Sequence, residues 1–549
     1  MIMYIGMERL IRLFRLCLVC LFLIVNLPGT GRVYAADNTS GETVRKATII
    51  VTYTRYEWWL LQWSDNTLLC QVYIDHEGWP TVQDVLTDCG GAIYSQWINT
   101  QPCSGVGEGQ LPTSGCFGLY LYYVGSAPAE KTIEVDLPPA QVYVTLSGCT
   151  PVPPENLCPI IPILHFEGKE PLPNEQITAI HVKIEGMETT CEGSTCDIQL
   201  QPTILAGTTV EFWADSSFGD SSAIFTAMVR VIDSGVSASP TSGGWYVDVI
   251  STRWQGNDLA TCSQVWQAFP PVGGVPEWLS TPEDAAFLAT EEPYSYLAGR
   301  LIAEGAVDAS SCPSGGLLSN GYADNCGLEL AMPEVIIWQN QFDDQIMQVA
   351  NDLKVPAQLL KNLFAQESQF WPGVYRQPNE FGLGQITDNG ADALLLWNPS
   401  FYNQFCPLVL NEDQCSVGYL KLDEADQAIL RGALANSADA DCATCEFGID
   451  LTVTDTSISL VAHTMLANCE QVAQIVYNAT GQIAGEVSSY EELWKFTIAD
   501  YHVGPGCLSY AMYTTWASKS PMDWEHVSTH FTEPCGTVIP YVDQVISTP

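Results

Sequence analysis

Hydrophobic and polar residues divide this chain into two kinds of sequence. Up to about residue 232, short β-branched and aromatic segments such as 47–54 and 119–124 alternate with turn residues, which is typical of strands. From Pro333 onward, apolar residues recur every three to four positions, which is typical of helices. The pattern predicts a multidomain α+β protein that is β-rich first and all-α afterwards.

Proline- and serine-rich segments suggest where these domains end. Pro151, Pro153 and Pro154 mark one linker, and residues 234–244 are predicted as another. Turn-separated strands between the two linkers predict an immunoglobulin-like sandwich. The predicted parts are a signal peptide at 1–35, a β-rich disulfide-bonded domain at 46–148, the sandwich at 155–233, an irregular and partly helical connection at 245–332, and an all-α domain at 333–549.

The N-terminus predicts export. Arginines precede an apolar run at 16–27, and Val33-Tyr34-Ala35 fits a signal-peptidase site. An uncleaved signal anchor is the alternative, although the run is short for a spanning helix, which needs about 20 apolar residues. The expected location is therefore extracellular or at the cell surface.

Cysteine usage agrees with an oxidising compartment. Of 20 cysteines, Cys17 and Cys20 fall in the predicted signal, which leaves an even number for disulfides. Close pairs such as 191/196 and 406/415 fit stapled hairpins or loops, and Cys442-Ala-Thr-Cys445 is expected to be a plain disulfide, not half of a zinc site. The all-α domain holds an odd number, so one cysteine is expected to pair upstream, with Cys326 as the candidate, or to stay free.

The net charge of −43 argues against nucleic acid as a partner, because phosphate binding needs clustered lysine and arginine. No pattern in the sequence predicts a metal site or a cofactor.

Residues 355–371 are predicted as a helix that carries a carboxylate on its apolar side. Glu367 follows Leu363 by four positions and Phe364 by three, so it shares their face. One interpretation is a carboxylate at the edge of the apolar stripe or paired with arginine. The other is a general acid, because partial burial disfavours the charged form and raises the pKa of a carboxyl until it can donate a proton near neutral pH.

The residues that follow favour the general acid. Pro372 stands five residues after Glu367, and Gly-Leu-Gly-Gln-Ile begins fifteen residues after it. With Glu-Ser at 367–368, this pattern resembles the first signature of the soluble lytic transglycosylase family. A helix is predicted at 488–501, with Ser488 and Ser489 as the candidate caps. Residues 500–506 (DYHVGPG) are similar to the family's Ala-Tyr-Asn-Ala-Gly-Pro-Gly motif, and 539–545 (IPYVDQV) resembles its closing Tyr-Val helix. The pieces keep the family's order over about 180 residues.

This resemblance implies a lysozyme-like α fold at 333–549. It also implies an enzyme that cleaves the β-1,4 bond between N-acetylmuramic acid and N-acetylglucosamine in peptidoglycan and leaves a 1,6-anhydro end. Carried over, Glu367 protonates the leaving oxygen and then takes the proton of the muramic 6-hydroxyl. Ser368, Gln385 and Tyr501 match motif positions that shape the site and contact the sugar or the carboxylate. Most glycosidases pair two carboxylates, whereas this family uses one.

Some positions depart from the family pattern. Gly384 stands where the motif has a methionine that packs on the sugar, which predicts weaker sugar contacts or a wider cleft. His502 replaces asparagine, and both residues are still expected at the substrate site. The other departures are Val503, Arg376 and Asn379-Glu380.

Three functions stay open at this point: a secreted transglycosylase whose β domains position it through cell-surface partners, a lysozyme-like hydrolase of peptidoglycan or a chitin-like polymer, and an inactive surface binding or structural protein. Asp388 is a candidate second carboxylate for the hydrolase, although a loop cap is the simpler interpretation. His463 is expected to be structural. Trp58, Trp59 and Trp63 are expected to pack in a core and not to bind sugar.

Overall fold

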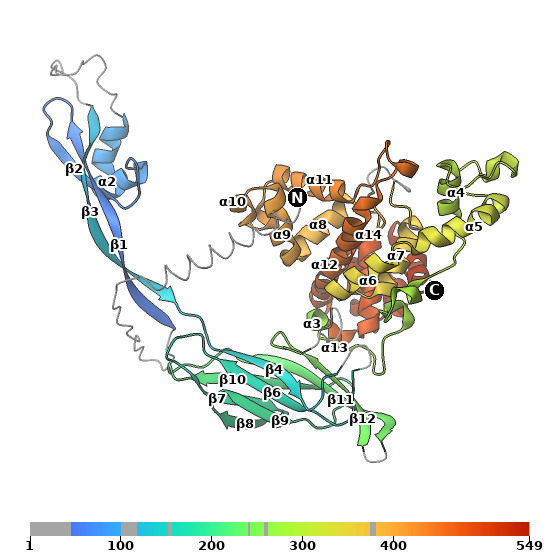
Figure 1. Cartoon of the computed structure of the whole chain (residues 1–549). Helices are drawn as coiled ribbons and strands as arrows, with labels where there is room; N and C mark the ends of the chain where they lie inside the picture. Colours follow the sequence, from blue (N-terminus) through green and yellow to red (C-terminus); the bar gives the residue numbers. More distant parts are fainter. Residues whose placement is uncertain are drawn as a thin grey trace, which may run out of the picture. The chain divides into compact units, whose positions relative to one another are not determined.

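The computed structural model of the chain describes residues 45–99, 118–151, 156–239, 242–256, 262–373 and 380–547. Strands occupy the N-terminal part and helices the C-terminal part, so the predicted α+β class is confirmed at that level (Figure 1). The predicted signal peptide, Cys103, Cys116, Arg376 and Asn379 lie outside the described residues. Within the described ranges, no helix is both long and apolar enough to cross a membrane.

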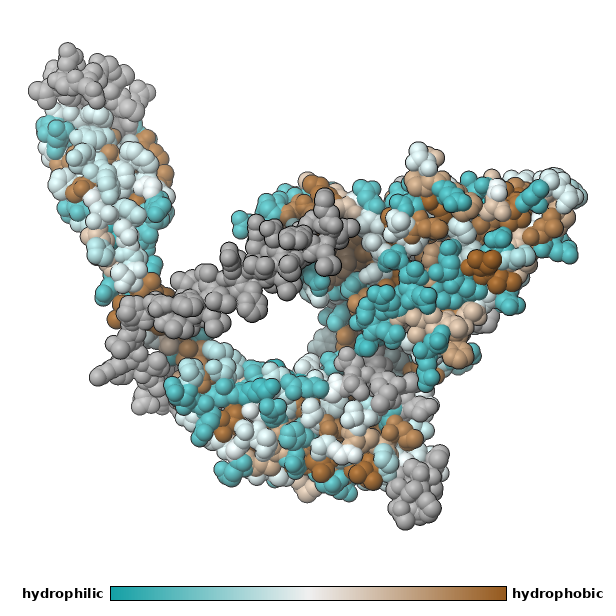
Figure 2. Space-filling model, viewed as in Figure 1, coloured by the Kyte–Doolittle hydropathy of each residue, from teal (hydrophilic) through white to brown (hydrophobic). Residues whose placement is uncertain are grey.

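The described residues form two compact units. The first contains residues 45–140 together with the segments 170–176 and 216–221, and the second contains the rest. Figure 2 shows hydrophilic residues spread over much of the visible surface of the helical region, with apolar residues between them. This surface agrees with the acidic composition of the chain.

The first unit is a three-stranded antiparallel sheet covered by one helix. Its order is β2-β1-β3, with β1 at Lys46–Gln62, β2 at Leu68–Ile74 and β3 at Leu119–Asp136. Helix α2 (Val82–Asn99) packs Val85 against Trp58, Leu60 and Val72 of the sheet. The Cys70–Cys89 disulfide fastens β2 to this helix.

A buried arginine joins three separate segments of the first unit. The Arg45 guanidinium pairs with Glu170 at 2.6 Å and with Asp220 at 2.5 Å, and it also donates to the Pro138 carbonyl at 2.7 Å. Burial alone would raise the pKa of Glu170, but hydrogen bonds from Arg45 and Ser216 lower it to about 2. The ion pairs therefore hold loops together that are 125 and 175 residues from Arg45 in sequence.

The second unit begins with two packed sheets. One has the order β4-β6-β9 and the other β5-β12-β11-β10-β7-β8, and the rings of Phe166 (β6) and Phe212 (β10) meet between them at 4.9 Å. The strands are β4 (Gln141–Ser147), β5 (Leu157–Cys158), β6 (Ile163–Lys169), β7 (Ile177–Ile184), β8 (Met187–Glu192), β9 (Thr195–Gln199), β10 (Thr208–Ser216), β11 (Phe225–Ser239) and β12 (Ser242–Ile250).

Two predicted boundaries of this sandwich were wrong. Strand β4 falls inside the predicted first domain at 46–148, yet it pairs with β6 from Gln141 to Ser147. The predicted linker at 234–244 is the end of a long hairpin, because β12 pairs with β11 back to Ile250 opposite Met228. Serine and glycine are common in linkers and in hairpin ends alike, so composition did not separate the two.

The helical region follows the sandwich in the second unit. Helix α5 is N-capped by Asp324 and continues past Pro333, so it begins before the predicted boundary at 333. The elements are α3 (Ser263–Trp266), α4 (Ser295–Ala303), α5 (Asn325–Asn340), α6 (Asp343–Leu353), α7 (Ala357–Ser368), α8 (Asp388–Trp397), α9 (Pro399–Val409), α10 (Glu412–Cys415), α11 (Glu424–Ala438), α12 (Thr454–Thr480), α13 (Ala484–Val487), α14 (Tyr490–Ala517), α15 (Trp524–Ser528) and α16 (Val538–Ser547). Short 3-10 turns lie at Glu277–Leu279, Ala285–Leu288, Pro313–Gly316, Tyr419–Lys421, Glu446–Gly448, Leu451–Val453 and Cys535–Thr537.

Disulfides staple both units. The pairs 191–196, 406–415 and 442–445 form as the sequence suggested. The cysteine of the helical region that pairs upstream is Cys469, and its partner is Cys262. Cys326, the predicted partner, instead pairs with Cys312. Further bonds join 149 to 158 and 507 to 535.

Candidate active site

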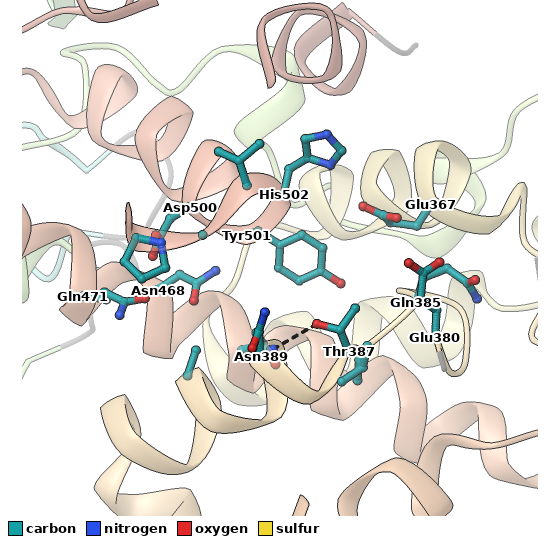
Figure 3. Close-up of a pocket in the computed structure, with 17 residues that line it drawn as sticks. Glu367, Glu380, Gln385, Thr387, Asn389, Asn468, Gln471, Asp500, Tyr501 and His502 are labelled. Carbon is teal, nitrogen blue, oxygen red and sulfur yellow. Dashed lines mark hydrogen bonds between the residues drawn. The ribbon is translucent and has the colours of Figure 1, made fainter. Parts of the chain in front are cut away.

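A cavity of about 340 Å³ opens in the helical region and contains Glu367 (Figure 3). Four segments build it: the end of α7, the stretch from Glu380 into α8, the middle of α12, and α14 at its break. The lining residues are Glu367, Glu380, Gln385, Ile386, Thr387, Asn389, Gly390, Ala393, Thr464, Asn468, Gln471, Asp500, Tyr501, His502, Val503, Gly504 and Pro505.

Glu367 lies in the last turn of helix α7, which runs through the core. Every residue from Ala357 to Ala365 is buried, including Lys361, whose ammonium pairs with Asp343 at 2.5 Å. The helix is thus enclosed on all sides and not only along the predicted stripe. It ends at Ser368, three residues earlier than predicted, because Gln369 and Phe370 adopt positive φ. Glu367 lies in this last turn, half-buried, where the helix meets the cavity.

Two serines fix the loop that follows. Ser368 is fully buried, and its hydroxyl donates to the Leu383 carbonyl at 2.7 Å. Ser457 of α12 accepts from the Leu383 N–H at 2.9 Å. Gly382 has φ +70° and lies so close to Ser457 that a Cβ would overlap its hydroxyl. Ser368, which the family motif suggested as a site residue, therefore fixes the loop and does not itself line the cavity.

Gly384 lies beneath Tyr501. The Tyr501 hydroxyl donates to the Gly384 carbonyl at 2.5 Å. A Cβ on Gly384 would overlap Val461 and would stand 2.8 Å from that hydroxyl. The space that a side chain at 384 would need is thus occupied from within the protein. A wider cleft was expected here, but the substitution does not open one toward the cavity, which Gly384 does not line.

Tyr501 lies between the two ends of the cavity in Figure 3. Burial raises its pKa well above the usual value, and the negative charges of Glu367 and Glu380 raise it further. Its phenol is therefore neutral at physiological pH. It can hold the loop through Gly384, but it cannot serve as a base.

Gln385 has one free oxygen at the cavity wall. Its backbone has φ +50°, and its side-chain amide donates to the Gly382 carbonyl at 2.7 Å. Its Oε1 has no hydrogen-bond partner among the described residues. A buried acceptor left this way is available to a donor on a ligand.

Helix α16 supplies a partner for Glu367, and α14 supports that partner. The Tyr541 hydroxyl on α16 donates to Glu367 Oε1, and the His502 ring stacks on Tyr541 at 3.9 Å with a 10° interplanar angle. Helix α14 is N-capped by Ser489, as predicted, and breaks at Gly504 before Pro505. The Cys507–Cys535 bond ties its second half to the segment that leads into α16.

Residues that the sequence analysis did not assign also line the cavity. Glu380 was noted only as a departure from the family, yet it is the second carboxylate close enough to act on Tyr501. Thr464, Asn468 and Gln471 lie at spacings of four and three on α12 and share one face. Polar residues at this helical period were the signal that could have found them. Asp500 also lines the cavity.

Other residues singled out from the sequence lie elsewhere. Asp388 is an exposed residue in the first turn of α8, next to its cap Thr387, and is not a cavity residue. His463 is mostly buried beside Phe401, and burial lowers its pKa. Trp58 packs in the core of the first unit, the Trp59 indole donates to Glu57 at 2.7 Å, and Trp63 lies against Tyr120 at 4.3 Å.

No protein-family model matches the chain, and comparison with curated proteins finds no match either.

Proposed function

We propose that helices α5 to α16 form a lysozyme-like domain of a lytic transglycosylase, with Glu367 as the single acid and base. The observation that carries the proposal is the placement of Glu367. It stands half-buried at a helix end, receives a hydrogen bond from Tyr541 on one oxygen, and faces a cavity whose other lining includes Gln385 and Tyr501. These residues come from the three sequence segments that resemble the soluble lytic transglycosylase family.

In the proposed reaction, the Glu367 carboxyl donates its proton to the glycosidic oxygen between N-acetylmuramic acid and N-acetylglucosamine. The bond from muramic C1 to that oxygen breaks, and N-acetylglucosamine leaves with the proton. The muramic 6-hydroxyl then attacks C1, and its proton passes to Glu367. The carboxyl is regenerated and the product carries a 1,6-anhydro ring, so no water is consumed.

A hydrolase is the second candidate, and Glu380 is the observation that favours it. Enzymes that hydrolyse a glycosidic bond usually have two carboxyl groups in one cavity. One protonates the leaving group and the other activates water. Glu380 and Glu367 both line the cavity, and both act on Tyr501. On this alternative the product has a reducing end.

The β-rich parts fit a role in positioning the enzyme. The division of strands, with β4, β6 and β9 in one sheet and β7, β10 and β11 in the other, supports an immunoglobulin-like sandwich. Eight described disulfides and the predicted signal fit an exported protein at the cell surface.

The test is digestion of purified peptidoglycan by the full chain, followed by mass spectrometry of the products. Fragments lighter by one water than reducing-end fragments support the transglycosylase, and reducing-end fragments support the hydrolase. The Glu367→Gln variant should lose turnover by at least about a hundredfold, since general acid catalysis supplies that much or more. If the native chain and this variant both bind peptidoglycan and neither cleaves it, the protein is a binding protein and the proposal is wrong.

A further inference from the structure

The cavity has a second polar end, away from Glu367. Figure 3 shows Asp500, Asn468 and Gln471 on one side of the Tyr501 ring, with Glu367, Glu380 and Gln385 on the other. The resemblance to the transglycosylase motif does not account for this end, because the motif has alanine where this chain has Asp500.

Asp500 is buried with half of its hydrogen-bonding capacity unused. Its side chain is 3% exposed. Gln471, with its amide oriented to suit both neighbours, donates to Asp500 Oδ2 at 2.8 Å and accepts from the Trp397 indole at 2.8 Å. Asp500 Oδ1 has no partner among the described residues. Leaving a buried polar atom unpaired costs stability, so such an atom is a candidate for contact with a ligand.

The surroundings of Asp500 are polar but uncharged. Thr464, Asn468 and Gln471 of α12 line the same cavity, and none of the residues lining the cavity is a lysine or an arginine. Burial without a cation raises the pKa of Asp500 to about 8, so the carboxyl is mostly neutral at physiological pH. A neutral site of this kind favours a neutral hydrogen-bonding group over an ammonium group.

We infer that the Asp500 end is a subsite for a secondary amide carried by the substrate. The protonated Asp500 carboxyl donates from its free Oδ1 to the amide carbonyl, and the Asn468 side-chain oxygen accepts from the amide N–H. A secondary amide carries its acceptor and its donor on separate atoms, so it can bond to both side chains at once. The inference rests on the proposed glycan-cleaving function of the same cavity, and it adds the chemical group that the substrate must carry.

Two parts of peptidoglycan offer this group: the acetamido substituent of an amino sugar and the stem peptide on muramic acid. Calorimetric titration of the full-length Glu367→Gln chain separates them. The probes are N-acetylglucosamine oligomers, the same oligomers after de-N-acetylation, and glycan strands with and without stem peptides. This Glu367→Gln chain, with Asp500 intact, should bind the N-acetylated oligomers at least about tenfold more tightly than the de-N-acetylated ones.

In the Glu367→Gln chain, Asp500→Ala should remove that preference. Alanine is the residue that the family motif has at this position, which is why it is chosen as the replacement. Asp388→Asn, which removes an exposed acid outside the cavity, is the matched control and should leave the preference intact. If the alanine variant is too unstable to titrate, Asn468→Leu removes the second partner and should have the same effect. Loss of affinity confined to peptide-bearing strands would assign the amide to the stem peptide.

The subsite would be overturned if N-acetylated and de-N-acetylated oligomers bind equally and Asp500→Ala causes no loss confined to peptide-bearing strands. A loss in Asp500→Ala that is the same for all probes would also overturn it. Because the native chain's cleavage products are measured separately, this result leaves the proposed function standing. A native chain that neither cleaves nor binds any of the probes would overturn both.

Discussion

The Tyr541 phenol donates a hydrogen bond to Oε1 of Glu367, across 174 residues of sequence. The bond fixes one carboxyl oxygen of Glu367. The His502 ring stacks on the tyrosine ring, which limits rotation of the phenol. In the proposed reaction Tyr541 is therefore a positioning residue, which acts through Glu367.

Removing the Tyr541 hydroxyl should slow turnover more than it weakens substrate binding. In Tyr541→Phe we expect kcat on peptidoglycan to fall roughly tenfold, because a hydrogen bond to a carboxylate contributes about 1.5–3 kcal/mol. KM should stay nearly constant. Tyr513→Phe, which alters an exposed tyrosine on α14, is the control. An unchanged kcat with a raised KM would instead place Tyr541 in substrate binding.

Glu380 separates the two proposed reactions. If the enzyme is a transglycosylase, Glu380→Gln should retain anhydro products and lose less than about tenfold in rate, because no water needs activation. If it is a hydrolase, the same change should cost on the order of a hundredfold, as expected for loss of a general base. Product analysis by mass spectrometry, with Asp388→Asn measured in parallel, decides between the outcomes.

Gly384 should not tolerate a side chain. Gly384→Ala places a Cβ against Val461 and 2.8 Å from the Tyr501 hydroxyl. We expect a loss of about 1–3 kcal/mol, as is usual for overpacking, visible as a lower Tm. Combining it with Val461→Ala should recover part of the loss. A Tm of the double variant below that of both single variants would show that the two sites do not relieve each other.

The stability of the chain should depend on pH through Asp500. Its pKa is about 8 in the folded chain, against about 4 in an unfolded chain. Between these values the unfolded chain releases the proton while the folded chain keeps it, so the contribution of protonated Asp500 is complete below pH 4 and is lost as the pH rises to 8. The loss is at most about 1.4 kcal/mol per pH unit. Asp500→Asn should flatten the fall in Tm across this window, and parallel Tm curves for the two chains would contradict the assignment.

The disulfide between Cys262 and Cys469 should stabilise the helical region. It closes 207 residues of chain, whereas 442–445 closes three. Replacing both cysteines of the long-range pair by alanine should cost about 2–4 kcal/mol. The same change at 442 and 445 should cost less, because a short loop loses little entropy on closure. Thermal melting of the two double variants provides the comparison, and a larger effect at 442–445 would contradict it.

Local pattern predicted the helices around the cavity well. The apolar period around Glu367 and the cap at Ser489 depend on neighbours within a few residues, and both appear in the structure. The linker predicted at 234–244 failed because strand pairing, and not the composition of the turn, decides whether such a segment continues a sheet.

The cavity was harder to predict because its members come together only in the folded chain. In the sequence, Glu380 was noted only as a departure from one motif, and Asp500 only as a residue within another motif. The effect of Gly384 depends on Val461, which lies 77 residues later in the printed sequence. Sequence spacing identified the Glu367 end of the cavity, and tertiary packing supplied the other end.

The Arg45 ion pairs bear on how the first unit could be moved between proteins. Its carboxylate partners, Glu170 and Asp220, lie on segments that the chain reaches only after it has entered the second unit. A fragment that stops at residue 140 would lose both counter-charges of this guanidinium, together with the two loops that carry them. The first unit therefore cannot be transferred to another protein as one continuous segment. A transfer would have to include the loops at 170–176 and 216–221 as well.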